Sequence, residues 1–181
     1  RLCRAERSAI RLLKGGLYHN VASHGFLPEH KERMEQEPVK PGPGSIVGRV
    51  VLEGKSVHVI DAQLDPDPEV ANRSRLGKTH TMLQVPLLRE GTPIGVLLLQ
   101  RSIVQPFTDK EIVLAETFAE PLSLAIENVR LFEAEKQRTQ ELSESLEQQT
   151  ATSEVLQVIS RTGSEPQPVF DTILAKAADL C

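Results

Sequence analysis

A chain of 181 residues is long enough for one ordinary domain and a short additional segment. Aromatic residues make up only 3%, which argues against a platform that stacks single-stranded nucleic acid, and a net charge of −4 argues against a duplex-DNA surface. The only cysteines, Cys3 and Cys181, exclude a disulfide-rich secreted scaffold and a four-cysteine zinc site. We expect a cytoplasmic segment with no nucleic-acid partner and, because its apolar runs are short, no membrane contact.

Short strands interrupted by Gly and Pro are predicted for the N-terminal part of the chain. Residues 8–13 and 17–23 flank Gly15-Gly16 and predict a β-hairpin. Residues 28–37 are polar and helix-prone, which predicts a short surface helix.

A second helix is predicted over residues 46–53. The preceding segment, 38–44, is rich in Pro and Gly, which stop helices and strands alike. Ser45 is a suitable N-cap, and Gly54 would end the helix. Residues 57–60 then predict a compact strand.

A polar excursion interrupted by prolines spans residues 61–77, and the two most apolar strands follow it. These strands are predicted over 81–88 and 93–100, on either side of a tight hairpin loop. The continuous apolar content of the second predicts a central strand buried on both faces. Pro86 in the first indicates an edge position or a local bulge, because proline has no N–H to donate to a ladder.

One long helix is predicted from Thr108 onward. Thr108 is a good N-cap, and Pro121 within the helix predicts a kink. Apolar residues recur at helical spacing and continue into a segment too polar to be stable alone, so we expect a weak coiled coil with a second copy of the chain. A solvated single helix is the alternative. The residues predicted to pair in a homodimer through this helix are Ile126, Val129, Phe132, Leu142 and Leu146.

Several segments together carry a resemblance to a known family. They are LCRAERSAIRLL, VASHGF, GSIVGRVVLEGKSVHVIDAQLDPD, MLQVPLLREGTPIGVLLLQR and FTDKEIVLAETFAEPLSLAIENVRLFEA. In this order they resemble GAF domains of bacterial multidomain signalling proteins of the sensor histidine kinase or cyclase type. The resemblance implies an α+β fold (an α/β sandwich), with an antiparallel sheet of about five or six strands, helices packed on it and a ligand pocket.

The resemblance also implies a division of the chain into three parts. Residues 1–130 would be a GAF sensory domain, 131–160 a signalling-helix coiled-coil linker, and 161–181 the first helix of a following GAF module. The sensory domain would then lack its own N-terminal helix, and the helix predicted over 167–181 could replace it, from the same chain or from a partner.

Several chemistries of this family lack their residues here. No cysteine lies between Arg4 and Leu180, so we expect neither a covalently attached bilin nor thiol catalysis in the pocket. The Asn-Lys-Phe-Asp-Glu pattern of cyclic-nucleotide GAF domains is absent, and the long helix holds no histidine that a kinase could phosphorylate. Asp61, Asp65 and Asp67 lack the spacing of a calcium loop and are interpreted as turn and capping residues. We predict no catalytic residue and no metal, and the cofactor stays unknown.

The implied pocket lies beside the segment that follows the third predicted strand. Arg73, Arg75, Lys78 and His80 gather there and favour a small anionic ligand, whereas a solvated surface helix is the alternative interpretation. The candidate ligand-binding residues are Val59, Asp61, Arg75, Leu76, His80 and Met82.

We therefore predict a non-catalytic sensory and dimerisation module in which the state of a small-molecule pocket is coupled to a paired output helix. The alternative function is a degenerate GAF domain that acts only as a structural dimerisation spacer. A free-standing enzyme is disfavoured, because no nucleophile–base pair can be assembled from the sequence.

Overall fold

The computed structural model describes residues 4–161 and Leu174. These residues belong to two compact units, the first ending at Glu127 and the second beginning at Asn128. The predicted helix over 167–181 lies outside the described residues, apart from Leu174. No helix in the described part of the chain combines the length and apolarity that crossing a bilayer requires.

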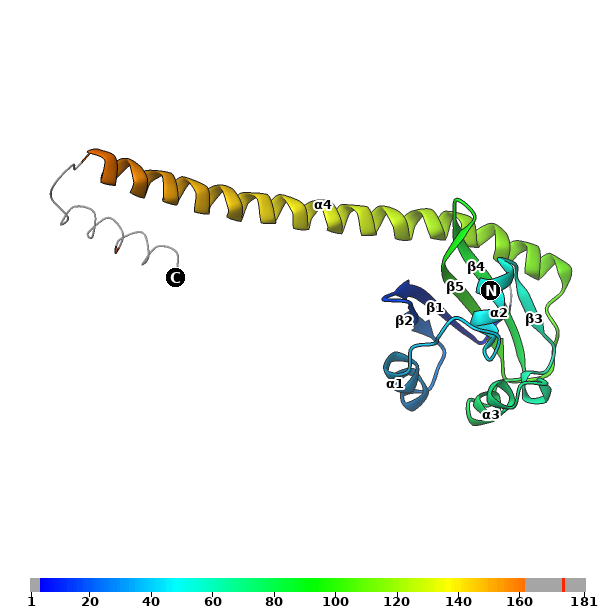
Figure 1. Ribbon diagram of the computed structural model, residues 1–181. Helices are drawn as coiled ribbons and strands as arrows, with labels where there is room; N and C mark the ends of the chain where they lie inside the picture. Colours follow the sequence, from blue (N-terminus) through cyan, green and yellow to red (C-terminus); the bar gives the residue numbers. More distant parts are fainter. Residues whose placement is uncertain (1–3, 162–173, 175–181) are drawn as a thin grey trace. The chain divides into compact units, whose positions relative to one another are not determined.

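A five-stranded antiparallel sheet forms the centre of the first unit, in the order β2-β1-β5-β4-β3 (Figure 1). Its strands are β1 (Arg7–Lys14), β2 (Leu17–His24), β3 (Val57–Val59), β4 (Thr81–Arg89) and β5 (Thr92–Arg101). Both predicted hairpins form, with Gly15 and Gly16 in one turn and Glu90 and Gly91 in the other, all at positive φ. The predicted α+β architecture is confirmed.

The helices follow the predicted positions except in one segment. They are α1 (Pro28–Gln36), α2 (Ile46–Glu53), the 3₁₀ turn η1 (Ala62–Leu64), α3 (Pro68–Leu76) and α4 (Asp109–Arg161). Helix α2 begins as predicted at Ser45, whose Oγ accepts a hydrogen bond from the Gly48 N–H at 3.0 Å, and ends at Gly54 with φ 62°.

Residues 61–77 contain helix α3 and are not only the polar, irregular segment that the sequence predicts. Pro68 occupies its first turn, and the Asp67 side chain accepts hydrogen bonds from the N–H groups of Glu69 and Val70. Proline in the first turn after an aspartate cap starts a helix rather than breaking one. The same prolines that suggested irregular structure therefore mark where this helix begins.

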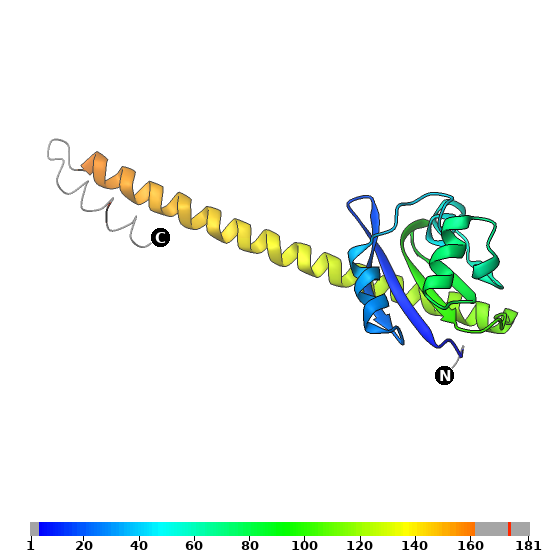
Figure 2. The same cartoon turned by 90° about the horizontal axis from the view of Figure 1, so that it is seen from below.

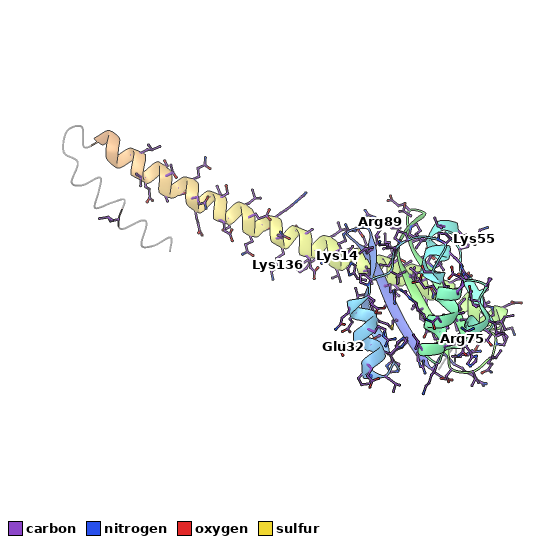
Figure 3. All side chains as sticks on the ribbon, turned by 60° about the horizontal axis from the view of Figure 1, so that its bottom comes forward. Lys14, Glu32, Lys55, Arg75, Arg89 and Lys136 are labelled. Atoms are coloured by element: carbon purple, nitrogen blue, oxygen red, sulfur yellow. The ribbon has the colours of Figure 1, made fainter. Side chains whose placement is uncertain are left out.

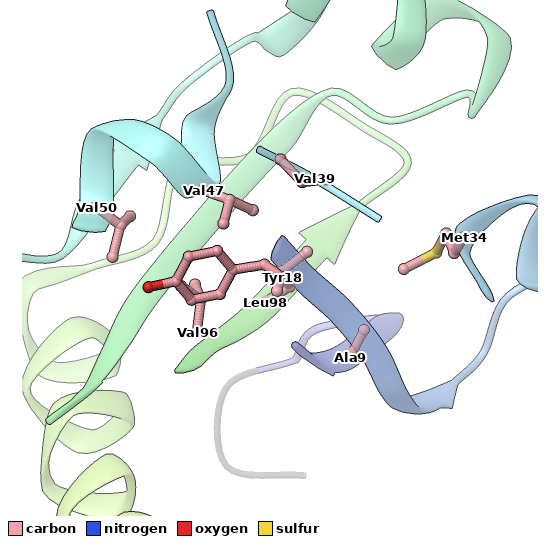
Figure 4. Packing of buried hydrophobic residues seen from close by; sticks show 8 residues of the cluster. All are labelled: Ala9, Tyr18, Met34, Val39, Val47, Val50, Val96 and Leu98. Carbon is pink, nitrogen blue, oxygen red and sulfur yellow. The ribbon is translucent and has the colours of Figure 1, made fainter. Parts of the chain in front are cut away.

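Helices cover both faces of the sheet (Figure 2). On one face, α1 and α2 pack on β1, β2 and β5, with the ring of buried Tyr18 beside Val47 and Val50 of α2 (Figure 4). On the other face, the first turns of α4 pack against alternate residues of β4, such as Leu83 and Val85. This alternation follows from the pleat of a β-strand, which sends successive side chains to opposite faces.

The two apolar strands lie where the sequence predicts, in the middle of the sheet. Strand β5 pairs with β1 on one side and β4 on the other, which confirms it as the central strand. Strand β4 is not the edge strand, but β3 pairs only with its residues 82–84. Pro86 lies beyond that short pairing, so its missing N–H removes no hydrogen bond to β3.

Candidate functional site

A cavity of about 140 Å³ lies between the sheet and the helices α1, α2 and α3. Its apolar lining includes Met34, Val47, Val70, Met82 and Leu98. Its charged and polar lining consists of Arg11, His30, Arg33, Glu37, Ser45, Arg73, Ser74, Thr79, Gln84 and Gln100. An apolar pocket with a few convergent polar groups is the usual form of a small-molecule site.

The sheet places three polar side chains in this cavity. Arg11 of β1, Gln84 of β4 and Gln100 of β5 each share a strand face with the apolar cavity residues, while their neighbours on the strand face α4. In the ladders, Arg11 lies opposite Val96, and Gln84 lies opposite Leu98. Polar groups on the buried face of a sheet require hydrogen-bond partners, so each of these side chains is a candidate ligand contact.

Arg11 is a buried cation that lacks a complete set of partners. Its residue is only 8% exposed, and its Nε and Nη1 atoms have no hydrogen-bond partner. Burial and the positive charge of Arg73 lower the pKa of Arg11 to about 10. The negative charge of Glu37 acts in the opposite direction and raises this pKa. The guanidinium stays protonated at neutral pH, so the cavity holds a positive charge that an anion could neutralise.

The remaining charges of the cavity lie nearer its rim. Arg73 of α3 forms an exposed ion pair with Glu69, with an Nη2–Oε1 distance of 2.9 Å. The ring of His30 stacks on Phe26 with centroids 5.3 Å apart. Burial lowers the pKa of His30, and the positive charges of Arg7, Arg33 and Arg11 lower it further. The electrostatics of the site therefore oppose any additional cation.

The two glutamines differ in how their amides are satisfied. Gln100 accepts a hydrogen bond from the Thr79 hydroxyl at 3.3 Å, and its Nε2 lies 4.0 Å from the sulfur of Met82. Gln84 is 3% exposed, and its Oε1 has no hydrogen-bond partner. Gln84 is thus a second buried polar residue of the cavity lining with an atom that lacks a hydrogen-bond partner.

An ion pair joins α2 to the segment just before α3, beside the cavity. Arg49 of α2 donates to both carboxylate oxygens of the buried Asp65, at 2.8 and 2.6 Å. These hydrogen bonds are the largest cause that lowers the pKa of Asp65. The Asp65 carboxylate also accepts from the Asp67 N–H, just before α3. The carboxylates of this segment are therefore engaged in turns and caps, as the sequence indicated, and Asp65 also forms an ion pair that the sequence did not indicate.

The predicted ligand-binding residues are only partly brought together. Met82 lines the cavity, and Val59 packs beside it in the same apolar cluster without joining the lining. Asp61 lies 3.0 Å from the Nδ1 atom of His80 and caps η1, away from the lining. Arg75 lies on α3 (Figure 3) and donates to the Gln63 carbonyl, and Leu76 is exposed. From the predicted basic segment, it is Arg73 that lines the cavity.

Sequence reasoning missed Arg11, His30, Gln84 and Gln100 as cavity residues. Arg11, Gln84 and Gln100 are each visible in the sequence as a polar residue that interrupts or ends an otherwise apolar strand. The strands are SAIRLL, TMLQVPLL and PIGVLLLQ. A polar residue at a buried strand position must be satisfied by something, which makes it a candidate ligand contact. His30 lies in a polar helix and had no such signal.

A buried cluster joins the end of β5 to the start of α4. Arg101 follows the cavity residue Gln100 and donates to the carbonyl of Gln105 and to Oε1 of Glu111, both at 2.8 Å. Glu111 Oε2 accepts from the backbone N–H of Thr108 at 2.9 Å, which completes a capping box at the predicted N-cap. Adjacent residues of one strand thus contact the cavity and the helix.

The residues predicted to pair in the long helix fall into two environments. Ile126 is partly buried against the apolar cluster of the first unit. The other four are more than half exposed, and they are Val129, Phe132, Leu142 and Leu146. Helix α4 runs through Pro121 without interruption.

Comparison with known proteins identifies the class to which this fold and cavity belong. A sequence model of the GAF domain matches residues 3–127, so the chain belongs to the GAF domain family. GAF domains are generally sensory or regulatory modules, although some proteins of this fold are enzymes. A search of curated proteins found no match.

Solved structures of similar fold come from several kinds of bacterial protein. The GAF domain of a phosphoenolpyruvate-protein phosphotransferase (ptsP) from Coxiella burnetii is 25% identical, with a TM-score of 0.62 over 72% of this chain and 76% of that one. A domain of a protein assigned as a two-component sensor histidine kinase from Sinorhizobium meliloti 1021 is 21% identical, with a TM-score of 0.60 over 75% of this chain and 88% of that one. The free methionine-R-sulfoxide reductase of Neisseria meningitidis, solved with its substrate, is 19% identical, with a TM-score of 0.58 over 70% of each chain.

Proposed function

We propose that this chain is a non-catalytic sensory module that binds a small anion in its cavity and couples that binding to pairing of helix α4 with a second copy. The observation that carries the proposal is Arg11, a buried guanidinium with unpartnered nitrogens in the lining of the cavity. An unpaired buried charge destabilises a fold, and a ligand that neutralises it on binding offsets that cost.

The second half of the proposal rests on the exposed apolar residues of α4. Val129, Phe132, Leu142 and Leu146 recur with spacings close to a heptad, on a helix whose other positions are mostly polar. Pairing with the same helix of another copy would cover them. The contact between Arg101 and Glu111 offers a route by which the strand beside the cavity could bias the start of that helix.

The wider setting is proposed by analogy with the similar structures. The Sinorhizobium meliloti protein supports a place within a bacterial signalling protein, where the catalytic output would lie outside this segment. We propose that the segment works in the cytoplasm and continues into a following GAF module.

Thermal unfolding of the full chain with small anions tests the binding step. Sodium acetate, nitrate and phosphate, each at about 10 mM and at constant ionic strength, would be compared with chloride. At least one anion is expected to raise the melting temperature by several degrees, because a ligand that binds only the folded state stabilises it. Arg11→Met is expected to abolish the rise.

A matched control is Arg75→Gln, because Arg75 is exposed on α3 and does not line the cavity. This variant should keep the full response to the anion. If no anion stabilises the wild-type chain, the sensory proposal fails and the structural-spacer alternative takes its place. If Arg75→Gln abolishes the response while Arg11→Met keeps it, the site lies at the sequence-predicted residues instead.

A further inference from the structure

Two buried polar groups without partners line the same cavity, and they are of opposite kinds. The Nε and Nη1 atoms of Arg11 are donors, whereas Oε1 of Gln84 is an acceptor. Both residues are more than nine-tenths buried. Leaving buried polar atoms without hydrogen-bond partners is unfavourable. A ligand that hydrogen-bonds to both Arg11 and Gln84 therefore gains more binding free energy than one that bonds to either alone.

The sheet register sets how far apart these two groups lie. Arg11 and Gln84 belong to strands separated by β5, and their ladder partners Val96 and Leu98 are two residues apart on that strand. Standard strand spacing and rise then separate the two Cα atoms by roughly 12 Å. Both residues line the same cavity, so we expect a short ligand to reach from one to the other.

A second source of positive potential lies at the same cavity. The lining includes Ser45, Ile46 and Val47, which form the start of α2. The first bond of this helix runs from the Arg49 N–H to the Ser45 carbonyl. The N–H groups of Ile46 and Val47 therefore have no acceptor within the helix, and a helix N-terminus of this kind favours an anion.

We infer that the ligand is a compact monocarboxylate whose far end carries a hydrogen-bond donor. This inference rests on the function proposed above. The carboxylate would lie at Arg11, whose planar guanidinium suits bidentate contact, and the donor would reach Oε1 of Gln84. A cavity of about 140 Å³ resembles in size an engineered cavity of about 150 Å³ that holds benzene, which limits the buried ligand to a molecule of that scale.

The charge of the ligand follows from the lining. Arg11 is the one charged lining residue more than nine-tenths buried among those that the structure describes, and Arg73 already pairs with Glu69. In the amide orientation of the structure, a second carboxylate on the ligand would place an acceptor against the Gln84 oxygen, which is itself an acceptor. The cavity is therefore matched to one negative charge and one neutral donor.

Isothermal titration of the full chain with four isosteric molecules tests this inference. Succinamate carries one carboxylate and one amide; succinamide has no charge, succinate has two, and levulinate replaces the amide by a methyl ketone that cannot donate. Succinamate is expected to bind roughly tenfold more tightly than levulinate, because only succinamate supplies the missing donor. Succinate should bind more weakly than succinamate, and succinamide should not bind detectably.

Variants assign the two ends of the ligand. Gln84→Leu is expected to abolish the preference for succinamate over levulinate, and Arg11→Met to abolish binding of both. The control Arg75→Gln should leave both affinities unchanged. If a substituted chain fails to fold, the order of the four affinities on the wild type still decides the inference.

The outcomes separate this inference from the function on which it rests. If levulinate or succinate binds as tightly as succinamate, the inference is overturned, while anion sensing stands. If none of the four binds but acetate, nitrate or phosphate does, the inference again fails alone. If no anion binds, both fail.

Discussion

Arg11 shows how one residue can mark a binding site, because it places a charged side chain with unpartnered atoms in the lining of a cavity. Other buried charged side chains in the described part of the chain have partners, as Asp65 has Arg49 and Arg101 has Glu111. Arg11 lines the cavity, and two of its three guanidinium nitrogens have no hydrogen-bond partner. Because the burial of a charge is costly, a native sequence that keeps such a residue indicates a use for it.

The charge at Arg11 also contributes to the titration of His30. The pKa of His30 lies below its usual value, because of burial and of the positive charges of Arg7, Arg33 and Arg11. An anion bound at Arg11 would offset that repulsion, and it should therefore raise the pKa of His30. NMR titration of the His30 ring with and without phosphate measures this, and an unchanged pKa under saturating phosphate would contradict anion binding beside His30.

The lowered pKa of His30 also determines the direction in which stability changes with pH. Since the unfolded chain takes up a proton at His30 at a higher pH than the folded chain, the stability contributed by neutral His30 is complete above about pH 6.5. It is lost as the pH falls through the lower, folded pKa. Acidification should also strengthen anion binding, because protonated His30 adds a positive charge to the cavity lining.

At the scale of elements, the pair between Arg49 and Asp65 holds α2 against the segment that begins α3. Asp65→Asn should lower the free energy of unfolding by about 2 kcal/mol at pH 7, because it removes a charge-assisted bidentate contact. The pKa of Asp65 is lowered in the folded chain, so its contribution is present above its unfolded pKa of about 3.8 and is lost as the pH falls through the folded pKa.

Urea unfolding of wild type and variant at pH 7 and near pH 3 measures both effects. Asp67→Asn is the matched control, because asparagine caps a helix about as well as aspartate and should change stability little. Equal stability of Asp65→Asn and wild type at pH 7 would show that the ion pair contributes nothing to the fold.

The elements that the sequence predicted are those whose signals are local. Gly15-Gly16 fixes a turn, Ser45 caps α2, and the apolar run ending at Gln100 identifies a central strand, so each could be recognised from neighbouring residues. Helix α3 corresponds to the surface helix that was the alternative interpretation of the basic residues, and its start at Asp67 and Pro68 is hidden because prolines elsewhere interrupt helices.

The site was less predictable, because a cavity depends on residues far apart in the chain. Arg11 and Gln84 line one cavity only because of the strand register, and His30 lines it from α1, whose sequence is mostly polar. The predicted residues came from the segment that follows one strand, and of these Met82 lines the cavity. The basic residues Arg73, Arg75, Lys78 and His80 favour an anion, and of these Arg73 lines the cavity, but nothing in that segment points to Arg11.

At the scale of the whole molecule, the proposed function requires that the cavity and the long helix influence each other. An anion that binds the two pairing states unequally must shift the equilibrium between them, and the shift is reciprocal. A typical coupling changes affinity about 5- to 150-fold. Without such coupling, the cavity would be a binding site with no connection to the exposed stripe of α4.

Sedimentation equilibrium of the full chain, with and without saturating succinamate, measures that coupling directly. We expect a dimer whose dissociation constant changes at least about fivefold when succinamate binds. The ligand should have no effect on Arg11→Met, and a chain ending at residue 130 should be monomeric. A dissociation constant that stays the same while titration shows succinamate bound, or a shortened chain that dimerises equally well, would contradict the central claim that this cavity controls helix pairing.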